Sequence, residues 1–516
     1  MERGVKRFLT AVCLCFTGSL AQAQIVCLPI DVVRVDNADI LEPVNVQAIV
    51  APYQGRCIGL VEFDEILEKL TLAYVDLGFV LSRAYLPEQD LTKRELIIKV
   101  VEGELSDITI NGAQRPYWSH AVFPKLIGKP VNIRDVEQGL DQIESMPRWR
   151  ANMEFTPGED AGDSVLAVSA ETAKPYQIKV TTDNRGNDQT GKWNTGLSGD
   201  FTNLLGINDT LTWGVSKSVG PDPFSLGYSG DQNNSSSFEY TLPYGAWTWS
   251  YGMSWSDYEL TIPGAISPIV TNGKSRNQTL TARYLWSRDQ TTKHTVHATL
   301  TRARNANYIQ DVFIDASSRT LTGLELGYAV SKPFGPGSLD ATFHVARGLT
   351  WFGAQDARDV PEGGPNPQYL LLGFSADYVQ KLNDKTKWTS TATGQLSADR
   401  LYGGQSFAIG GVSTVRGSKI ALASGSSGIV WRNEIDYSLA QTTIGSATLY
   451  GALDFGRILA QPRLEITSAS ALGSAIGIKL NNDNFNFDLS YQKILKVSEG
   501  LQSPVGEWFV NVEFVF

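Results

Sequence analysis

The sequence predicts two small α+β modules followed by an all-β domain, a transmembrane β-barrel. Three observations indicate this fold class: an export signal at the amino terminus, helical periodicity confined to the first third of the chain, and alternating segments of roughly ten residues after Tyr176. The chain has 516 residues, and its 42% apolar and 10% aromatic content excludes a disordered protein. A net charge of −10 argues against nucleic acid as a partner, because phosphate binding needs a basic surface.

The amino terminus has the layout of a secretory signal peptide. Three basic residues precede an apolar run from Phe8 to Leu20, and Ala21-Gln22-Ala23 follows as a cleavage site. A membrane anchor needs about 20 apolar residues, and this run is shorter. We therefore expect residues 1–23 to be a signal peptide that is cleaved after Ala23.

Two cysteines remain after that cleavage. Cys27 and Cys57 form an even pair in an exported chain, for which a single disulfide is the natural expectation. A zinc site is the weaker interpretation, because no further ligands cluster near them.

The region from about residue 175 to 516 is typical of lipid-facing strands. One segment shows the pattern, with small polar residues between large apolar ones: Trp247, Trp249, Tyr251, Met253 and Trp255. Apolar outer faces, polar inner faces and aromatic girdles indicate an outer-membrane barrel, and the length allows roughly 14 to 18 antiparallel strands. A secreted β-sandwich is the alternative, although its exposed faces usually carry more charge. The chain ends in an alternating strand with Phe514 and Phe516, which is similar to the assembly signal of outer-membrane barrels.

The preceding residues contain two α+β modules, expected at 24–104 and 105–174. In the first, an apolar stripe from Phe63 to Leu77 predicts a helix that ends before Gly78, and alternating strands follow at 80–86 and 96–101. The second repeats this order more loosely, with a strand near Ile108, a helix carrying Val136 and Ile143, and closing strands at 151–155 and 165–170. Modules that precede such a barrel would lie in the periplasm.

Five segments carry a specific resemblance. Three of them, GFVLSRAYLPEQDL (78–91), VNIRDVEQGLDQI (131–143) and FTPGEDAGDS (155–164), resemble paired polypeptide-transport-associated (POTRA) domains. TTDNRGNDQTG (181–191) and FAIGGVSTVRG (407–417) resemble the barrel that follows them. Together they resemble the transporter component of two-partner secretion, the family of the hemolysin and filamentous hemagglutinin exporters. The resemblance implies two POTRA domains and a barrel of about 16 strands in the outer membrane, which secretes one large β-helical partner, an adhesin or hemolysin. It also supports a bond between the two cysteines.

The resemblance further implies an ion pair inside the pore. In the strand 447–455, alternation places Asp454 in the lumen, where a carboxylate needs a partner. In the family a long loop folds back into the pore, and its Arg, here Arg416, meets this Asp. The accompanying loop and wall motif consists of Gly410, Gly411, Val415, Gly417 and Gly456. Two positions depart from the family pattern, Ser418 and Ala452, and they put the packing of the loop tip in doubt.

Partner recognition is expected in the second module. The helix 131–143 and the strand 165–170 are candidates for β-augmentation by an extended segment, through a strand edge and a groove. The candidate residues are Val131, Arg134, Glu137, Val165 and Val168. The alternative is that their apolar side chains form the core of the module. Outer-membrane lipid and the barrel-assembly machinery are further expected partners, and nucleotide is not expected because no P-loop occurs.

An enzyme is not predicted. His294 and His297 are three apart in an expected strand and point to opposite faces, so they do not readily share a metal. GxSxG, HExxH and CxxC motifs do not occur, and we expect no catalytic residue, metal or cofactor.

Two other functions compete with the exporter: a general barrel-assembly factor, which usually has more than two modules, and a passive porin. The short stretch before Cys27 predicts no plug helix in the pore.

Overall fold

The computed structural model describes residues 27–160, 162–186, 190–220, 231–264, 267–442, 445–461, 464 and 467–516. The predicted signal peptide, and the residues on which the prediction of no plug helix depends, lie outside these ranges. The described chain forms two compact units. The first comprises residues up to Glu104 with Pro130–Asn132 and Asp160–Gly162, and the second comprises Leu105–Lys129, Ile133–Glu159 and Asp163–Phe516.

The first unit is a small α+β module. Its elements are β1 (Leu28–Ile30), β2 (Val32–Asp36), α1 (Pro43–Val50), β3 (Arg56–Ile58), α2 (Leu60–Asp76), β4 (Arg83–Tyr85) and β5 (Glu95–Val101). A sheet in the order β2-β5-β4 packs against α2, whose predicted apolar stripe is buried from Phe63 to Tyr74, whereas Leu77 follows the end of the helix and is 46% exposed. Gly78, with φ +96°, ends the helix as expected. The predicted strand 80–86 is shorter in the structure, because Ser82 N donates to Phe79 O and residues 79–82 form a turn.

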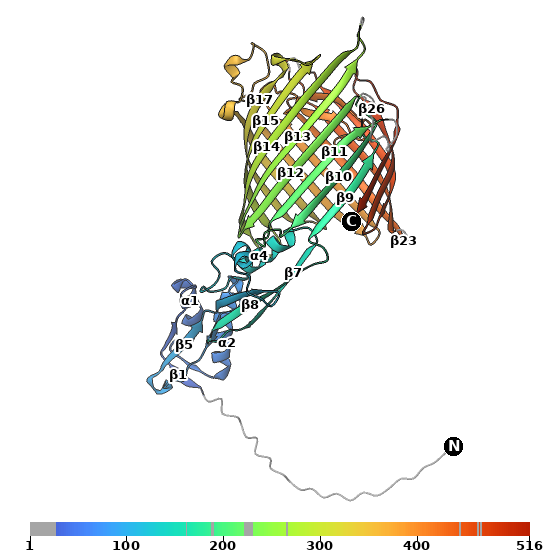
Figure 1. Ribbon diagram of the computed structural model, residues 1–516. Helices are drawn as coiled ribbons and strands as arrows, with labels where there is room; N and C mark the ends of the chain where they lie inside the picture. Colours follow the sequence, from blue (N-terminus) through green and yellow to red (C-terminus); the bar gives the residue numbers. More distant parts are fainter. Residues whose placement is uncertain are drawn as a thin grey trace, which may run out of the picture. The chain divides into compact units, whose positions relative to one another are not determined.

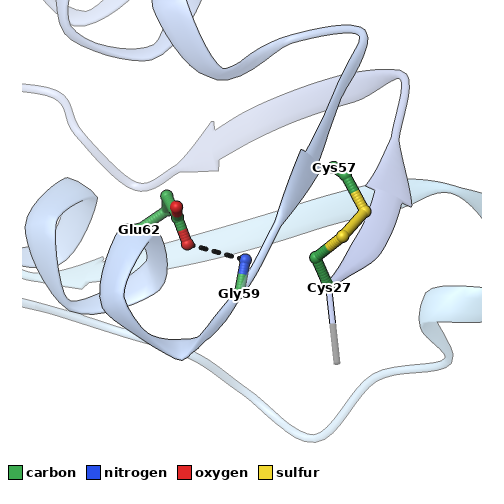
Figure 2. The surroundings of a disulfide bond; sticks show 4 residues. All are labelled: Cys27, Cys57, Gly59 and Glu62. Carbon is green, nitrogen blue, oxygen red and sulfur yellow. Dashed lines mark hydrogen bonds between the residues drawn. A yellow bond between two sulfur atoms is a disulfide. The ribbon is translucent and has the colours of Figure 1, made fainter. Parts of the chain in front are cut away.

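A disulfide joins Cys27 to Cys57, with their Cα atoms 5.3 Å apart (Figure 2). It ties the residue before β1 to β3, and these two strands pair in antiparallel register. Next to it, Gly59 N donates to Glu62 Oε2 at 2.8 Å and so begins α2. The disulfide expected from the sequence is therefore present, and it closes the amino-terminal strand pair.

The second α+β module belongs to the second unit. It contains β6 (Glu104–Ile110), α3 (Pro116–Val122), α4 (Ile133–Ser145), β7 (Trp149–Pro157) and β8 (Asp163–Thr172). The sheet order is β6-β8-β7, so β8 is the central strand. Val136 and Ile143 are fully buried on α4, as their periodicity predicts. Of the helices in the described ranges, none is both long and apolar enough to cross a membrane.

The rest of the second unit is a closed antiparallel barrel of 16 strands (Figure 1). The strands are β9 (Tyr176–Asp183), β10 (Trp193–Thr202), β11 (Thr210–Val219), β12 (Gln232–Tyr244), β13 (Trp247–Ile262), β14 (Ile269–Arg288), β15 (Lys293–Ile309), β17 (Arg319–Phe334), β18 (Gly337–Leu349), β19 (Leu370–Asn383), β20 (Thr386–Leu396), β23 (Gly428–Thr442), β24 (Gly445–Ile458), β25 (Ala469–Asn481), β26 (Phe485–Val497) and β27 (Glu507–Val515). The two-residue β16 (Val312–Phe313) folds back on the end of β15 in antiparallel register and is not counted as a strand of the wall. β27 pairs with β9 to close the ring, and Phe514 and Phe516 are exposed on the outer surface.

Alternation along the strands gives the barrel two different faces. On β13 the predicted aromatic residues Trp247, Trp249 and Trp255 are exposed, while Gly252 between them is buried. This confirms the predicted class, because lipid-facing and lumen-facing side chains alternate in a membrane barrel. The turns at one end of the barrel contact the second module: Gln142 Nε2 donates to Gly245 O at 2.8 Å, and Arg288 pairs with Asp141 at 2.8 Å.

Candidate functional site

A long loop between β20 and β23 folds into the lumen. It carries a hairpin of β21 (Phe407–Gly410) and β22 (Ala421–Gly425). Ile409 and Val415 of this loop are fully buried. They pack against four lumen-facing side chains of the wall: Val430, Ile458, Ala471 and Ile494. The loop is therefore a packed element of the barrel interior, fixed by an apolar cluster at one side of the wall.

Glycines allow the loop to approach the wall. Gly410 and Gly411 have φ +93° and +89°, a left-handed turn that side chains rarely adopt. At Gly456 of β24 an added Cβ would lie 2.7 Å from Val415 Cγ2 and 2.8 Å from Ile409 Cγ2. Gly417 comes equally close to the wall, because its Cβ would lie 2.3 Å from Lys493 C. Each predicted motif glycine thus stands at the turn or at the contact of the loop with the wall.

Arg416 at the tip of the loop contacts Asp454 on β24. Its Nε donates to Asp454 Oδ2 and its Nη2 to Asp454 Oδ1, both at 2.7 Å. Its backbone N also donates to Asp454 Oδ2, at 3.0 Å. Asp454 is 0% exposed and Arg416 is 6% exposed. Two parallel hydrogen bonds between a guanidinium and a carboxylate form the strongest type of ion pair, and burial removes the competition from water.

The pair belongs to a larger charged network that the sequence did not predict. Arg416 Nη1 contacts Glu434 of β23, and Glu434 in turn contacts Lys479 of β25. Lys479 Nζ reaches Asp436 at 3.1 Å, and Arg432 Nε lies 3.8 Å from Asp454. The alternation that placed Asp454 in the lumen also applies to β23, and following it there would have found Glu434 and Asp436.

The two positions that depart from the family pattern, Ser418 and Ala452, have the following surroundings in the structure. Ser418, which is buried, accepts from Ile420 N at 3.3 Å and donates to Ile420 O at 2.8 Å. Ala452 lies opposite Glu434 in the β23–β24 register. Ile409 and Val415 fill the space beside Gly456, on the wall strand that carries Ala452.

The partner-binding prediction needs a correction. β8 was expected to offer a strand edge, but it is the central strand of its sheet, paired with β6 and β7 on its two sides. Val168 is 2% exposed and lies in the core of this module, Val131 is also buried at 1% but belongs to the first unit, and Val165 is half-buried. Of the polar candidates on α4, Arg134 is exposed and Glu137 lies 3.5 Å from Arg288 of the barrel.

The sequence profile of the family described as "Haemolysin secretion/activation protein ShlB/FhaC/HecB" matches residues 162–480. A profile described as "POTRA domain, ShlB-type" matches residues 28–103, and one described as "POTRA domain" matches residues 104–157. The chain belongs to this haemolysin secretion/activation family. It is an outer-membrane transporter of two-partner secretion with periplasmic POTRA domains, which confirms the resemblance found in the sequence.

Individual relatives agree with this assignment. The chain is 32% identical to the outer membrane transporter CdiB of Escherichia coli over 456 residues, which are 88% of this chain and 76% of the relative. It is 28% identical to the hemolysin transporter protein ShlB of Serratia marcescens over 473 residues, 90% of this chain and 82% of that protein. The solved structure of CdiB from Escherichia coli superposes with a TM-score of 0.87 at 28% identity, and covers 96% of this chain and 92% of that one. Members of the family are transporters and move large exported partner proteins.

Proposed function

We propose that this transporter secretes one large β-helical partner, an adhesin or hemolysin, and that release of the β20–β23 loop from the wall opens its path. The observation that carries the proposal is the buried contact of Arg416 with Asp454. It joins a loop that fills part of the lumen to a strand of the wall. Separating the two breaks side-chain contacts but leaves every strand pair of the barrel intact, so the loop can move while the barrel stays closed.

Recognition of the partner is proposed at β7. This strand lies at the outer side of the β6-β8-β7 sheet, so one of its edges has no strand beside it in that order. The start of β6 at the opposite side is partly covered, because Leu105 forms a bridge with Ile127. An extended segment of the partner could add to β7 through backbone hydrogen bonds. This replaces β8 as the strand that receives the partner.

Two further contacts belong to the proposal. Phe514 and Phe516 are exposed at the closing strand and suit recognition by the barrel-assembly machinery during biogenesis. The exposed aromatic side chains of β13 suit the interface of the outer-membrane lipid. We also propose that transport needs no catalytic residue, nucleotide or metal.

A secretion assay tests the proposal. The transporter is produced together with the large exported protein that we expect to be encoded beside its gene, as wild type, as Arg416→Ala, and as Arg283→Ala. Arg283 is a matched control, because it alternates with Leu280 and Ala282 on β14 and so faces the lumen away from the loop. We expect partner protein in the medium with wild type and with Arg283→Ala, and at least about tenfold less with Arg416→Ala, which removes both guanidinium hydrogen bonds from the buried Asp454.

Other results separate the competing functions. Equal secretion by wild type and Arg416→Ala would remove the ion pair from the mechanism and keep the exporter. If folded wild type secretes nothing, a general barrel-assembly factor or a passive porin becomes the better explanation. Assembly of other outer-membrane proteins and conductance of small solutes then distinguish these two.

A further inference from the structure

The outer surface of the barrel carries a group of arginines with no acidic partner. Arg276 of β14 and Arg304 of β15 lie directly opposite each other, and Gln278 and Arg302 form the next pair. These residues share the face of Leu280, which is 45% exposed among the lipid-facing side chains. Within the described ranges of the chain, none of the three arginines forms an ion pair with a carboxylate. Like charges placed opposite each other on a sheet are unfavourable unless an anion compensates them.

The arginines lie where the hydrocarbon layer ends. The ring centroids of Trp247 and Tyr284 lie 4.6 Å apart near the turn that contacts α4, and this aromatic pair marks the periplasmic border of the barrel. Arg276 is eight residues farther along β14. With a rise of about 3.3 Å per residue and a tilt of about 40°, this places it roughly 20 Å above that border. An apolar band of about 25 Å therefore ends close to these arginines, at the head groups of the outer leaflet.

A hollow on the outer wall adjoins the same arginines. It has a volume of about 520 Å³, and its floor consists of Leu280, Leu300 and Tyr251. Phe352 of the β18–β19 loop covers its upper end, where Arg302 Nε donates to Phe352 O at 3.2 Å. The loop turns η4 (Trp351–Gly353) and η5 (Ala357–Asp359) are the golden-orange coils beside β17 in Figure 1. The hollow thus has an apolar floor and a cationic rim.

Neighbouring side chains hold the arginines in place. Gln278 Nε2 donates to Tyr251 OH at 3.0 Å, and Arg302 Nη1 donates to Gln278 Oε1 at 3.4 Å. The Arg276 guanidinium lies 5.9 Å from the centre of the Trp255 ring, a cation–π contact. The next outward pair, Asp257 and Lys274, contains one charge of each sign, so the excess of positive charge is confined to the arginines. Arginine side chains that only extended into water would not need these hydrogen bonds and this cation–π contact.

We infer that this part of the barrel binds the phosphorylated head group of a glycolipid of the outer leaflet. Arginine matches phosphate with two parallel hydrogen bonds, so Arg302, Arg304 and Arg276 would hold the phosphate. An acyl chain of the same lipid would lie over Leu280 and Leu300. The inference rests on the position of the barrel in the outer membrane and does not depend on the transport mechanism proposed above.

Native mass spectrometry of the full chain in detergent tests the site. The probes are lipid A with its phosphates, dephosphorylated lipid A, and inorganic phosphate. We expect wild type to bind phosphorylated lipid A and Arg302→Gln/Arg304→Gln to bind it at least about tenfold more weakly. The matched control is Arg283→Gln/Arg56→Gln, which removes the same charge from the lumen and from the exposed Arg56 of β3 in the first α+β module, and it should bind within about twofold of wild type.

Three results would overturn the inference. These are equal binding by the arginine variant and wild type, equal binding of the dephosphorylated lipid, and full displacement of the lipid by inorganic phosphate, which would indicate a site for the free anion. If the double variant does not fold, Phe352→Ala serves in its place. It changes no residue of a strand, and it should weaken lipid binding several-fold by opening the hollow.

Discussion

Arg416 donates three hydrogen bonds to Asp454, one from its backbone N and two from its guanidinium. Because Asp454 is fully buried, Arg416→Ala leaves its carboxylate with only the backbone N of residue 416 and the Arg432 guanidinium 3.8 Å away, and breaking comparable buried pairs costs about 3–5 kcal/mol. The position of the loop therefore depends on both charged side chains. Replacing either Arg416 or Asp454 by an uncharged residue should release the loop from the wall.

Release of the loop can be measured by cysteine labelling. Ser418 is buried beside Arg416, and Ser418→Cys introduces a thiol of similar size. We expect this thiol to be protected from a water-soluble maleimide in the otherwise wild-type chain, and to react at least about tenfold faster when Arg416→Ala is added. Cys27 and Cys57 are bonded to each other and do not react. Equal labelling rates in both backgrounds would show that the ion pair does not hold the loop.

The close approach at Gly456 gives a second test, which leaves all charges unchanged. Gly456→Ala places a Cβ within 2.8 Å of both Val415 and Ile409, and such overpacking costs about 1–3 kcal/mol. Gly451 on the same strand is the control, because a Cβ added there meets nothing within 4 Å. We expect Gly456→Ala to speed labelling at position 418 and Gly451→Ala to leave it unchanged. Identical behaviour of the two variants would contradict the tight packing of the loop.

The two carboxylates that contact Arg416 should differ in importance. The side chain of Asp454 is 0% exposed, whereas that of Glu434 is 21% exposed and also contacts Lys479. Water can reach the charges left unpaired by Glu434→Gln, but it cannot reach those left unpaired by Asp454→Asn. We therefore expect Asp454→Asn to lower the thermal midpoint of the barrel more than Glu434→Gln. Differential scanning fluorimetry of the purified variants provides the order. A larger effect of Glu434→Gln would place the anchor of the loop on β23 instead of β24.

Much of the fold follows from local periodicity. The alternation of Trp247, Trp249 and Trp255 with small polar residues determines which face meets lipid, and a stripe such as Phe63 to Tyr74 determines the buried face of a helix. Both patterns are local, and side chains repeat every two residues in a strand and every 3.6 in a helix. The order of strands within the small sheets is not local. For this reason the sequence predicts a strand edge at 165–170, whereas in the structure β6 and β7 pair with β8 from both sides.

The same distinction applies to the site. Asp454 could be placed in the lumen by alternation alone, while its pairing with a loop residue came from the resemblance. The contacts of Glu434 with Arg416 and Lys479 join three separate segments of the chain. The hollow beneath Phe352 likewise forms only because a loop folds over β15. Such a contact between distant segments cannot be predicted from the spacing of residues in the sequence.

The first unit should lose stability at high pH through Tyr74. Burial, reinforced by the hydrogen bond to Glu102, raises the pKa of the Tyr74 hydroxyl well above its usual range. The hydroxyl donates to Glu102 Oε1 at 2.7 Å, and Ile40 N donates to the same oxygen at 2.9 Å. Because the folded state holds this proton more tightly than the unfolded state, its contribution is complete below the ordinary tyrosine pKa of about 10 and declines above it.

We therefore expect α2 to open more readily as the pH rises beyond about 10, and Tyr74→Phe to remove that dependence at a cost of about 1 kcal/mol at neutral pH. The exposed Tyr85 of the same unit provides the control Tyr85→Phe, which should keep the pH dependence of wild type. Limited proteolysis of the full-length protein between pH 8 and pH 11, followed by identification of the cleaved peptides, measures the opening. If α2 of Tyr74→Phe is cleaved with the same pH dependence as α2 of wild type, another group causes the loss of stability at high pH. The buried hydroxyl of Tyr74 would then only fill space in the core.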